Sequence, residues 1–562
     1  MRREVSVVNK KFSSFPILFA LLALLIGTCA VVFPASAQAA PTSTGSITVS
    51  GTVASSYDAY QIFSANVVDG DSDAKIATDL AWANDAARDA VLPVLHSVGM
   101  PSSQTTAQEA AEWLNADSHL TSALSAQLAR SLQSSGAVSV PLNAGTAAEL
   151  PCGYWLIVAD DDAIAQDEAG TAPIMVLVGG SAVTVKPKAA TPKVAKHVLE
   201  DSTAAWGKAA DATVADDLYW RLSATVPAGL SAYDTYTVRF VDTMSAGLDP
   251  SKVAASMRVY VAAGADGGFD AVQTGKDGRA GTESAKGWTD ITAQCATKVA
   301  ADGTFTVRTG DLVAALGGAD AFAAGARVVA VYDAPLNSAC NHGIAKGNPN
   351  EVYLRYPRSP FADQSGDAGF TRTPSDDACA YTWDLALTKR GSDGDKPLAG
   401  AVLSIADDRG RTLAADGTWD ADGKATVTTG EDGRVTVSGV DSGKLEVREL
   451  KAPKGYTAFE GTRCVTVKAE GLDVDQVAAA KPKLTITAES PLRADSADGS
   501  TGSLEASLIN TPTGTPPSIT TGGFMPSTGD MAMYAAAAAA VAGAALIVVA
   551  LLVKRGGGSH KE

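Results

Sequence analysis

The chain has 562 residues, with 45 lysines and arginines against 62 aspartates and glutamates, so its formal net charge is −17. This charge favours solubility and disfavours nucleic acid or anionic lipid as a partner. Between its two terminal segments the chain is long enough for about three or four domains.

The N-terminus has the organisation of a secretory signal peptide. Basic residues precede an apolar run from about Phe15 to Phe33, and Ala35-Ser36-Ala37 then places small residues at a cleavage site. We therefore expect residues 1–40 to be removed on export. An uncleaved anchor stays open as an alternative, because the apolar run is nearly long enough to span a bilayer.

Short alternating segments, such as 352–356 and 382–389, recur between clusters of Gly, Asp, Asn and Pro. They predict a mainly β protein built from sandwiches. The exception is roughly 81–132, where Thr106-x-x-Glu109 forms a capping box before a helical apolar face. We therefore expect the first domain to be β with inserted helices.

Changes in composition mark the domain boundaries. Segment 186–192 is rich in Pro and Lys, segment 360–378 is rich in Pro, Gly, Ser and Asp, and Gly, Thr and Pro dominate after Asn510. The predicted order is an N-terminal domain at 41–188, a middle domain at 189–376, a C-terminal domain at 377–512, a linker with a sorting motif at 513–530, and a membrane segment with a positive tail at 531–562.

The cysteines that remain after processing would lie in an oxidising compartment, where disulfides persist. Proximity favours pairing Cys295 with Cys340 and Cys379 with Cys464, which leaves Cys152 unpaired. Spacing alone does not determine this connectivity.

The first domain ends in Val183-Thr184-Val185-Lys186-Pro187-Lys188. This segment resembles the V-Y-P-K motif of Gram-positive pilins, with Lys186 in place of the aromatic residue. The resemblance implies that Lys188 links one subunit to the next. A charged linker lysine is the alternative, and Lys186 and Lys193 are the competing nucleophiles.

Between Pro41 and Val185 the sequence contains a single lysine, Lys75, in an Asp-rich loop. No lysine is therefore available on a core strand of the N-terminal domain. We expect this domain to lack an internal isopeptide bond.

The middle domain opens with a strand on which Val194, Lys196 and Val198 share one face. This strand, the segment 240–243 with Asp242 and the segment 347–354 resemble the strands of pilin middle domains. The resemblance implies an isopeptide bond from Lys196 with Asp242 as the catalytic acid. Asn350 and Asn348 share one parity, and we prefer Asn350 as the acceptor because it lies within the strand.

The C-terminal domain contains Glu449-Leu450-Lys451-Ala452-Pro453-Lys454-Gly455-Tyr456. This segment resembles the E-x-x-A-P-x-G-Y box of pilins and collagen-adhesin B-type domains. Strand parity places Lys389 on a face with large apolar residues, and Asn510 on the face of Leu508. A lone buried lysine is costly and a buried amide needs a partner.

In the resembling family such a lysine and asparagine are joined by a self-formed isopeptide bond. Burial favours the neutral amine of Lys389 and the protonated carboxyl of Glu449. The amine would attack the Asn510 carboxamide, Glu449 would polarise the carbonyl and move protons, and ammonia would leave. This is a single turnover within a fold and not an enzyme. An exposed lysine and a turn asparagine are the alternative.

Near the C-terminus, Met525-Pro526-Ser527-Thr528-Gly529 precedes an apolar segment, 531–553, and then Lys554-Arg555. The apolar segment and its cations would hold the pentapeptide just outside a membrane. The arrangement resembles the LPXTG sorting signal, with Met525 in place of leucine. The resemblance implies that a sortase cuts between Thr528 and Gly529, and a plain membrane anchor is the alternative.

No cofactor or metal site is expected. Asp69, Asp71 and Asp73 imitate the start of a calcium loop, but Ala74 replaces the required glycine and Leu80 the closing glutamate. No nucleotide-binding or hydrolase motif is present either.

The resemblances together imply tandem immunoglobulin-like sandwiches of the collagen-adhesin A and B types in a secreted pilus shaft subunit on a Gram-positive cell wall. The implied partners are identical subunits, pilin-type and housekeeping sortases, peptidoglycan, ancillary pilins and a host surface ligand. A monomeric wall-anchored adhesin or an ancillary pilin is the alternative, and neither needs a linking lysine.

Overall fold

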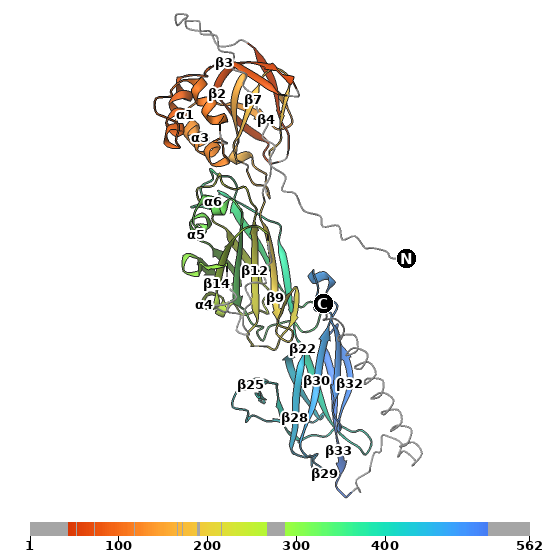
Figure 1. The fold of residues 1–562 in the computed structure, drawn as a ribbon. Coiled ribbons are helices and arrows are strands. Elements are labelled where there is room, and N and C mark those ends of the chain that lie inside the picture. Colours follow the sequence, from red (N-terminus) through yellow and green to blue (C-terminus); the bar gives the residue numbers. More distant parts are fainter. Residues whose placement is uncertain are drawn as a thin grey trace, which may run out of the picture.

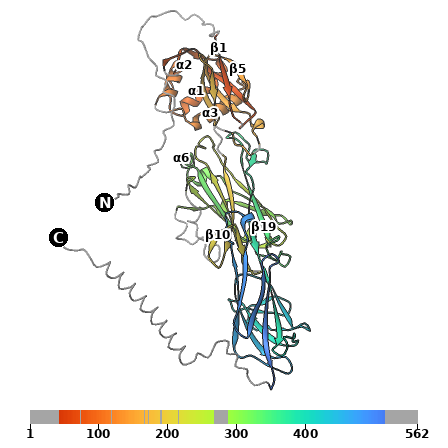
Figure 2. The same ribbon diagram turned by 90° about the vertical axis from the view of Figure 1, so that its right-hand side faces the viewer.

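The computed structural model describes residues 43–514, apart from gaps at 52, 72–73, 117–118, 166, 171, 188–190, 215 and 267–286. The predicted signal peptide, the sorting motif with Thr528 and Gly529, the apolar segment and Lys188 lie outside the described residues. Three β units follow one another along an elongated molecule (Figures 1 and 2). The structure confirms the predicted mainly β fold with tandem domains.

The N-terminal unit combines two sheets with inserted helices. One sheet has the order β5-β1-β8, and the other has the order β3-β2-β6-β7 with β4 also paired to β2. Its elements are β1 (Thr44–Val49), β2 (Ser56–Asp69), β3 (Lys75–Trp82), α1 (Asp85–Ser97), α2 (Ala107–Asn115), α3 (Ser122–Ser134), β4 (Val140–Asn143), β5 (Ala147–Pro151), β6 (Gly153–Ala159), η2 (Asp161–Ala163), β7 (Ile174–Val178) and β8 (Val183–Val185).

The helices of this unit begin and pack as the sequence predicts. The Thr106 side chain accepts from the Glu109 N–H, and the Glu109 carboxylate accepts from the Thr106 N–H, which confirms the capping box at α2. Apolar residues of the helices form one buried cluster with Ile62 of β2 and Leu156 of β6. The helices therefore cover one face of the β2–β6 sheet.

The middle unit is a sandwich of two sheets. Their orders are β10-β9-β12-β18-β14-β15 and β11-β21-β19-β13-β17-β16, with β20 also paired to β19. The elements are β9 (Lys193–Glu200), β10 (Ala205–Gly207), β11 (Ala209–Asp211), β12 (Tyr219–Val226), β13 (Arg239–Met244), η3 (Pro250–Lys252), α4 (Val253–Ser256), β14 (Arg258–Ala263), β15 (Thr289–Asp290), η4 (Thr292–Gln294), β16 (Ala296–Val299), β17 (Thr304–Arg308), α5 (Leu312–Ala315), α6 (Ala319–Phe322), β18 (Ala326–Asp333), β19 (Asn348–Pro357), β20 (Phe370–Arg372) and β21 (Asp376–Tyr381).

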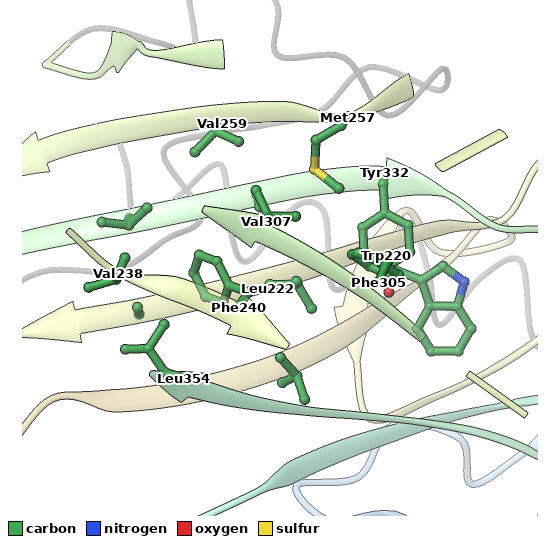
Figure 3. Close-up of a cluster of buried hydrophobic side chains, with 14 of the residues drawn as sticks. Trp220, Leu222, Val238, Phe240, Met257, Val259, Phe305, Val307, Tyr332 and Leu354 are labelled. Carbon is green, nitrogen blue, oxygen red and sulfur yellow. The ribbon is translucent and has the colours of Figure 1, made fainter. Parts of the chain in front are cut away.

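The two sheets of the middle unit share one apolar core. Figure 3 shows part of it, where Trp220 and Tyr332 from one sheet lie beside Phe240 and Phe305 from the other. The last strand, β21, pairs with β19 and extends this unit to Tyr381. The middle unit thus continues past the boundary expected at 376 and 377.

The C-terminal unit is a second sandwich of two sheets. Their orders are β27-β22-β33-β29, with β32 also on β33, and β25-β24-β23-β28-β30-β31, with β26 also on β23. The elements are β22 (Trp383–Gly391), β23 (Val402–Ala406), β24 (Thr412–Leu413), β25 (Trp419–Asp420), β26 (Val427–Thr428), β27 (Arg434–Val440), β28 (Gly443–Lys451), β29 (Tyr456–Thr457), β30 (Thr462–Glu470), η5 (Val477–Ala479), β31 (Lys483–Ala488), β32 (Leu492–Asp498) and β33 (Ser503–Pro512). The first strand, β22, runs parallel to the last, β33.

The structure contradicts both predicted disulfides, because all the described cysteines are free thiols. Cys379 lies on β21 of the middle unit, whereas Cys464 lies on β30 of the C-terminal unit, so that pairing would join two different domains. Cys295 contacts the Ile291 carbonyl, and the Cys340 sulfur contacts His342 Nε2 at 3.6 Å.

In the part of the chain that the structure describes, no helix combines the length and apolar character that a membrane span requires. The segment for which a span is predicted, 531–553, lies outside that part.

Candidate functional sites: two buried lysine, carboxylate and asparagine triads

The first triad lies inside the middle sandwich. Lys196 comes from β9 of one sheet, while Asp242 and Asn350 come from the neighbouring strands β13 and β19 of the other. All three residues are 0 % exposed. The two-residue period of each strand directs these polar side chains into the same interior as the apolar core.

A tyrosine hydroxyl joins the members of this triad. Lys196 Nζ donates to Asp242 Oδ2 and, at 2.9 Å, to Tyr332 Oη. Tyr332 Oη donates to Asp242 Oδ2 at 3.0 Å and accepts from Asn350 Nδ2 at 2.9 Å. The structure therefore brings Lys196, Asp242 and Asn350 together through Tyr332.

The alternative acceptor, Asn348, is bonded elsewhere. Its Oδ1 accepts from the Asn341 N–H at 2.8 Å, and its Nδ2 donates to the carbonyls of Asn341 at 2.9 Å and Ala380 at 3.2 Å. These bonds hold the loop before β19. The contacts therefore associate Asn350, and not Asn348, with the Lys196 site.

Tyr332 on β18 is a further residue of this site, which the sequence did not predict. Its hydroxyl contacts every member of the triad, and its ring packs edge-on against Phe305 with centroids 4.8 Å apart. Strand parity could not single it out, because nearly every residue of β18 is buried and both faces look like core.

Two further side chains hold the backbone of Lys196. The Lys196 N–H donates to Asp376 Oδ2 at 2.6 Å, and the Lys196 carbonyl accepts from Lys208 Nζ at 2.8 Å. Lys208 and Asp376 also form an ion pair with each other. These contacts fix β9 against β21 at the position of Lys196.

Burial sets the ionisation of the first triad. Desolvation lowers the pKa of Lys196 to about 8, although the nearby Asp242 favours the charged amine. Desolvation also raises the pKa of the Asp242 carboxyl. Burial and then the nearby Asp242 raise the pKa of Tyr332 well above its ordinary value, so this hydroxyl is a neutral phenol. A pKa of about 8 leaves an appreciable fraction of the Lys196 amine neutral near physiological pH.

The second triad lies inside the C-terminal sandwich. Lys389 is on β22, Glu449 is on β28 of the facing sheet, and Asn510 is on β33. Because β22 and β33 are adjacent and parallel, Lys389 pairs with Leu508 and Gly391 pairs with Asn510. The side chains of Lys389 and Glu449 are 0 % exposed.

In this triad the carboxylate itself touches both nitrogens. Lys389 Nζ donates to Asn510 Oδ1 and lies 3.3 Å from Glu449 Oε1. Asn510 Nδ2 donates to Glu449 Oε1 at 2.9 Å and to Oε2 at 3.1 Å. The Phe459 N–H donates to Glu449 Oε2 at 3.1 Å and so holds the carboxylate. Desolvation lowers the pKa of Lys389 to about 8, against the attraction of Glu449.

The single lysine of the first domain has different surroundings. Lys75 begins β3 instead of lying in the preceding loop, and its Nζ donates to the carbonyls of Gly179 at 2.5 Å and Ser181 at 2.7 Å, and to Asp69 at 3.3 Å. These partners tie β3 to the loop after β7. Among the described residues, the hydrogen-bond partners of Lys75 Nζ belong to Asp69, Gly179 and Ser181, and none is an asparagine side chain.

Two of the three lysines considered for the link between subunits lie within the described residues. Lys186 and Lys193, which flank the gap at 188–190, are both exposed. Within the described residues, no group of three or more histidine, cysteine, aspartate or glutamate side chains has an arrangement that could hold a metal ion.

Comparison with known proteins identifies one family and several relatives. Residues 384–481 match the SpaA family, described as a prealbumin-like fold domain. The trypsin-resistant surface T6 protein of Streptococcus pyogenes serotype M6 is 30% identical over 143 residues, which cover 24% of this chain and 24% of that protein. The chain thus matches about a quarter of the length of this curated relative.

Solved structures of pilins are also similar to the chain. The T6 backbone pilin of Streptococcus pyogenes is 16% identical, with 84% of this chain and 98% of that chain covered and a TM-score of 0.43. The major pilin SpaD from Corynebacterium diphtheriae is 15% identical, with 84% and 98% covered and a TM-score of 0.41.

The sheets define a protein of tandem β sandwiches, and its C-terminal unit contains a prealbumin-like SpaA domain. The matched part of the chain is similar to a streptococcal surface protein, and the C-terminal unit matches the SpaA family, in agreement with the resemblance of the sequence motifs to those of Gram-positive pilins.

Proposed function

We propose that the chain is the structural shaft subunit of a covalently polymerised pilus on a Gram-positive cell wall. This proposal rests on the two buried sites that each contain a lysine and an asparagine. Each site would form a covalent crosslink within one domain of a chain similar to backbone pilins. The signal peptide would direct export, and the segment Met525–Gly529 would be the sortase substrate.

The proposed reaction is the same in both domains. A neutral lysine Nζ attacks the asparagine Cγ, a C–N bond forms, and the bond from Cγ to Nδ2 breaks. One proton moves from the attacking nitrogen to the leaving nitrogen, which departs as ammonia. Glu449 contacts both nitrogens in the C-terminal site, which supports its role as the proton carrier.

The positions of these bonds support a mechanical role. Lys389 and Asn510 lie on the first and last strands of the C-terminal unit, which are adjacent. A bond between them would carry a pulling force across the domain without extending the chain in between. The middle bond would join β9 to β19 across the two sheets of its sandwich.

Polymerisation would use two further residues. A sortase would cleave after Thr528, and Lys188 of another subunit would attack the enzyme-bound Thr528 carbonyl. The housekeeping sortase would finally transfer the polymer to peptidoglycan. Ancillary pilins and a host surface ligand complete the proposed set of partners.

Expression of single Lys→Arg variants in the native host tests this proposal. Wild type should give a ladder of polymers from wall extracts on denaturing gels, whereas Lys188→Arg should give only wall-attached monomer. Lys186→Arg and Lys193→Arg are matched controls at exposed flanking positions and should keep the ladder. A full ladder from Lys188→Arg would contradict the assignment, and a wild type without a ladder would favour a monomeric adhesin.

A further inference from the structure

The two triads differ in how the carboxylate reaches the leaving nitrogen. Glu449 accepts directly from Asn510 Nδ2 in the C-terminal site. In the middle site the Asn350 amide nitrogen donates to Tyr332 Oη, so its contact with Asp242 runs through the Tyr332 hydroxyl. An aspartate side chain is one methylene shorter than a glutamate. The Tyr332 hydroxyl lies between Asp242 Oδ2 and Asn350 Nδ2 and bridges these two atoms.

The Tyr332 hydroxyl is fixed in this position by its surroundings. Tyr332 is 0 % exposed and belongs to β18, an internal strand of its sheet. Its ring lies against Phe305 in the core, as Figure 3 shows, and Lys196 Nζ lies 5.5 Å from the ring centroid. A hydroxyl held on a packed ring loses little freedom when it contacts the reacting groups.

Two buried oxygens of the site have no hydrogen-bond partner among the described residues. They are Asp242 Oδ1 and Asn350 Oδ1. Buried polar atoms normally find partners, and unpartnered ones mark sites of strain or chemistry. A proton on Asp242 Oδ1 would supply the donor that the developing oxyanion on Asn350 Oδ1 requires. If Asp242 donates to the oxyanion, a different group must transfer the proton from Lys196 Nζ to Asn350 Nδ2.

We propose that Tyr332 is a catalytic residue of the middle-domain reaction and relays the proton from Lys196 Nζ to the leaving nitrogen of Asn350. This inference rests on the proposed function of the triad. In the folded reactant, Lys196 donates to Tyr332 Oη and Asn350 Nδ2 donates to the same oxygen. After attack, Nδ2 becomes a tetrahedral amine with a lone pair, so its hydrogen bond with Tyr332 reverses.

The proton count of this relay balances. The Tyr332 hydroxyl, which donates to Asp242 Oδ2 in the folded reactant, turns toward the leaving nitrogen once that nitrogen has its lone pair. Tyr332 Oη then receives one proton from the attacking nitrogen and gives its own proton to the leaving nitrogen, so it ends as a phenol. The new bond joins Lys196 Nζ to Asn350 Cγ, and ammonia departs with the electron pair of the broken bond. The raised pKa of Tyr332 agrees with concerted exchange, because a free phenolate is disfavoured.

The deciding variant is Tyr332→Phe in the full mature chain. Intact mass and crosslinked peptides report the bond between Lys196 and Asn350, and the rate is followed after purification at fixed pH. Loss of a proton relay predicts that bond formation slows by about a hundredfold or more in the middle domain. The C-terminal bond should form as in wild type and so reports correct folding.

Tyr356→Phe is the matched control. Tyr356 is also 0 % exposed and lies on β19, six residues beyond Asn350, or about 20 Å along the strand. Its variant should keep both bonds. A Tyr332→Phe protein that forms the middle bond at the wild-type rate would overturn the relay. A wild type without this bond would instead refute the proposed function of the triad.

A second variant distinguishes catalysis from packing. In Asp242→Glu combined with Tyr332→Phe, the longer acid should reach both nitrogens, as Glu449 does, and restore the middle bond. A purely structural role of Tyr332 predicts no such recovery. Absence of the middle bond from a folded double variant would contradict the relay. If Tyr332→Phe alone folds poorly, the double variant still tests the relay, because its glutamate can contact both nitrogens.

Discussion

Lys196 and Lys389 share an environment that favours a neutral amine. Both are buried, both lie beside one carboxyl group, and burial lowers the pKa of each to about 8. At this pKa an appreciable fraction of each amine is uncharged near neutral pH. Folding therefore increases the fraction of each lysine that is present as the neutral amine, which is the form that can act as a nucleophile.

This chemistry predicts a mass deficit in the purified mature protein. Wild type should weigh less than its sequence by two molecules of ammonia, one from each triad. Asp242→Ala and Glu449→Ala should each restore one ammonia, because the lysine and asparagine remain but the acid that serves them is removed. Intact-mass spectrometry measures this difference. A wild-type mass equal to the sequence mass would exclude both bonds.

The burial of a single residue is easiest to predict on a strand whose buried and exposed positions alternate. On β22 the buried and partly exposed positions alternate strictly, so parity located Lys389 inside the core from sequence alone. Tyr332 lies on a strand buried on both sides, and its function depends on contacts from β9, β13 and β19. A residue whose role arises only from tertiary contacts leaves no periodic signal.

At the scale of elements, the pairing of β22 with β33 unites residues from both ends of the C-terminal unit. Lys389 and Asn510 are 121 positions apart in sequence. A covalent bond between them would close this loop in the unfolded chain as well. The unfolded state would lose conformational entropy, which stabilises the folded domain.

Loss of this bond should therefore lower domain stability. Glu449→Gln keeps the size of the side chain but removes the acid, and we expect the C-terminal domain to lose about 4 to 5 kcal/mol of unfolding free energy. Denaturant unfolding, followed by the fluorescence of the buried Trp383, measures the change. Unfolding of the N-terminal domain in the same chain is the control and should not move. Equal midpoints for variant and wild type would argue against a stabilising bond.

The limits of the domains were harder to predict than their type. The helical insertion of the first domain was recognised from a capping box, which is a local signal. The strand β21 lies in a stretch where composition suggests a linker, yet it pairs with β19 and, in parallel, with β11. Pairing with distant strands places β21 beside β19 and β11, and Cys379 on this strand is a free thiol and is not bonded to Cys464 as its proximity in sequence predicts.

For the whole molecule, the joint between the middle and C-terminal units depends on buried carboxyl groups. Asp211 Oδ2 of the middle unit accepts from Trp383 Nε1, the Ser442 N–H and Ser442 Oγ of the C-terminal unit, each at 2.7 Å. Arg411 Nη2 donates to Asp216 Oδ2 at 2.8 Å across the same joint. These contacts connect the two units directly.

Several carboxyl groups lie close together at the same joint. Burial and then Asp211 raise the pKa of Glu200 to about 7, and burial followed by Asp211 and Asp201 raises the pKa of Asp441 to about 8. Both values lie above those of an unfolded chain, which are about 4. The folded joint therefore holds protons that the unfolded chain releases.

This difference makes the joint more stable in mild acid than in mild base. Where the folded state binds more protons, stability falls as pH rises, here from about pH 4 up to the folded values of about 7 and 8. One such group contributes about 1.4 kcal/mol per pH unit over that range. We expect the melting temperature of the joined middle and C-terminal units to drop between about pH 6 and about pH 8.

The variant Asp441→Asn tests this origin, because an amide keeps the shape of the side chain and cannot ionise. It should raise the melting temperature in mild base and flatten the pH dependence, whereas the exposed Asp473→Asn, with the same change of charge, should leave the profile as in wild type. Scanning calorimetry of the mature chain at several pH values measures both. If the melting temperature of Asp441→Asn kept the full wild-type dependence on pH, this dependence would have to arise outside the joint. The buried carboxyl groups between the two domains would then not control the stability of their contact.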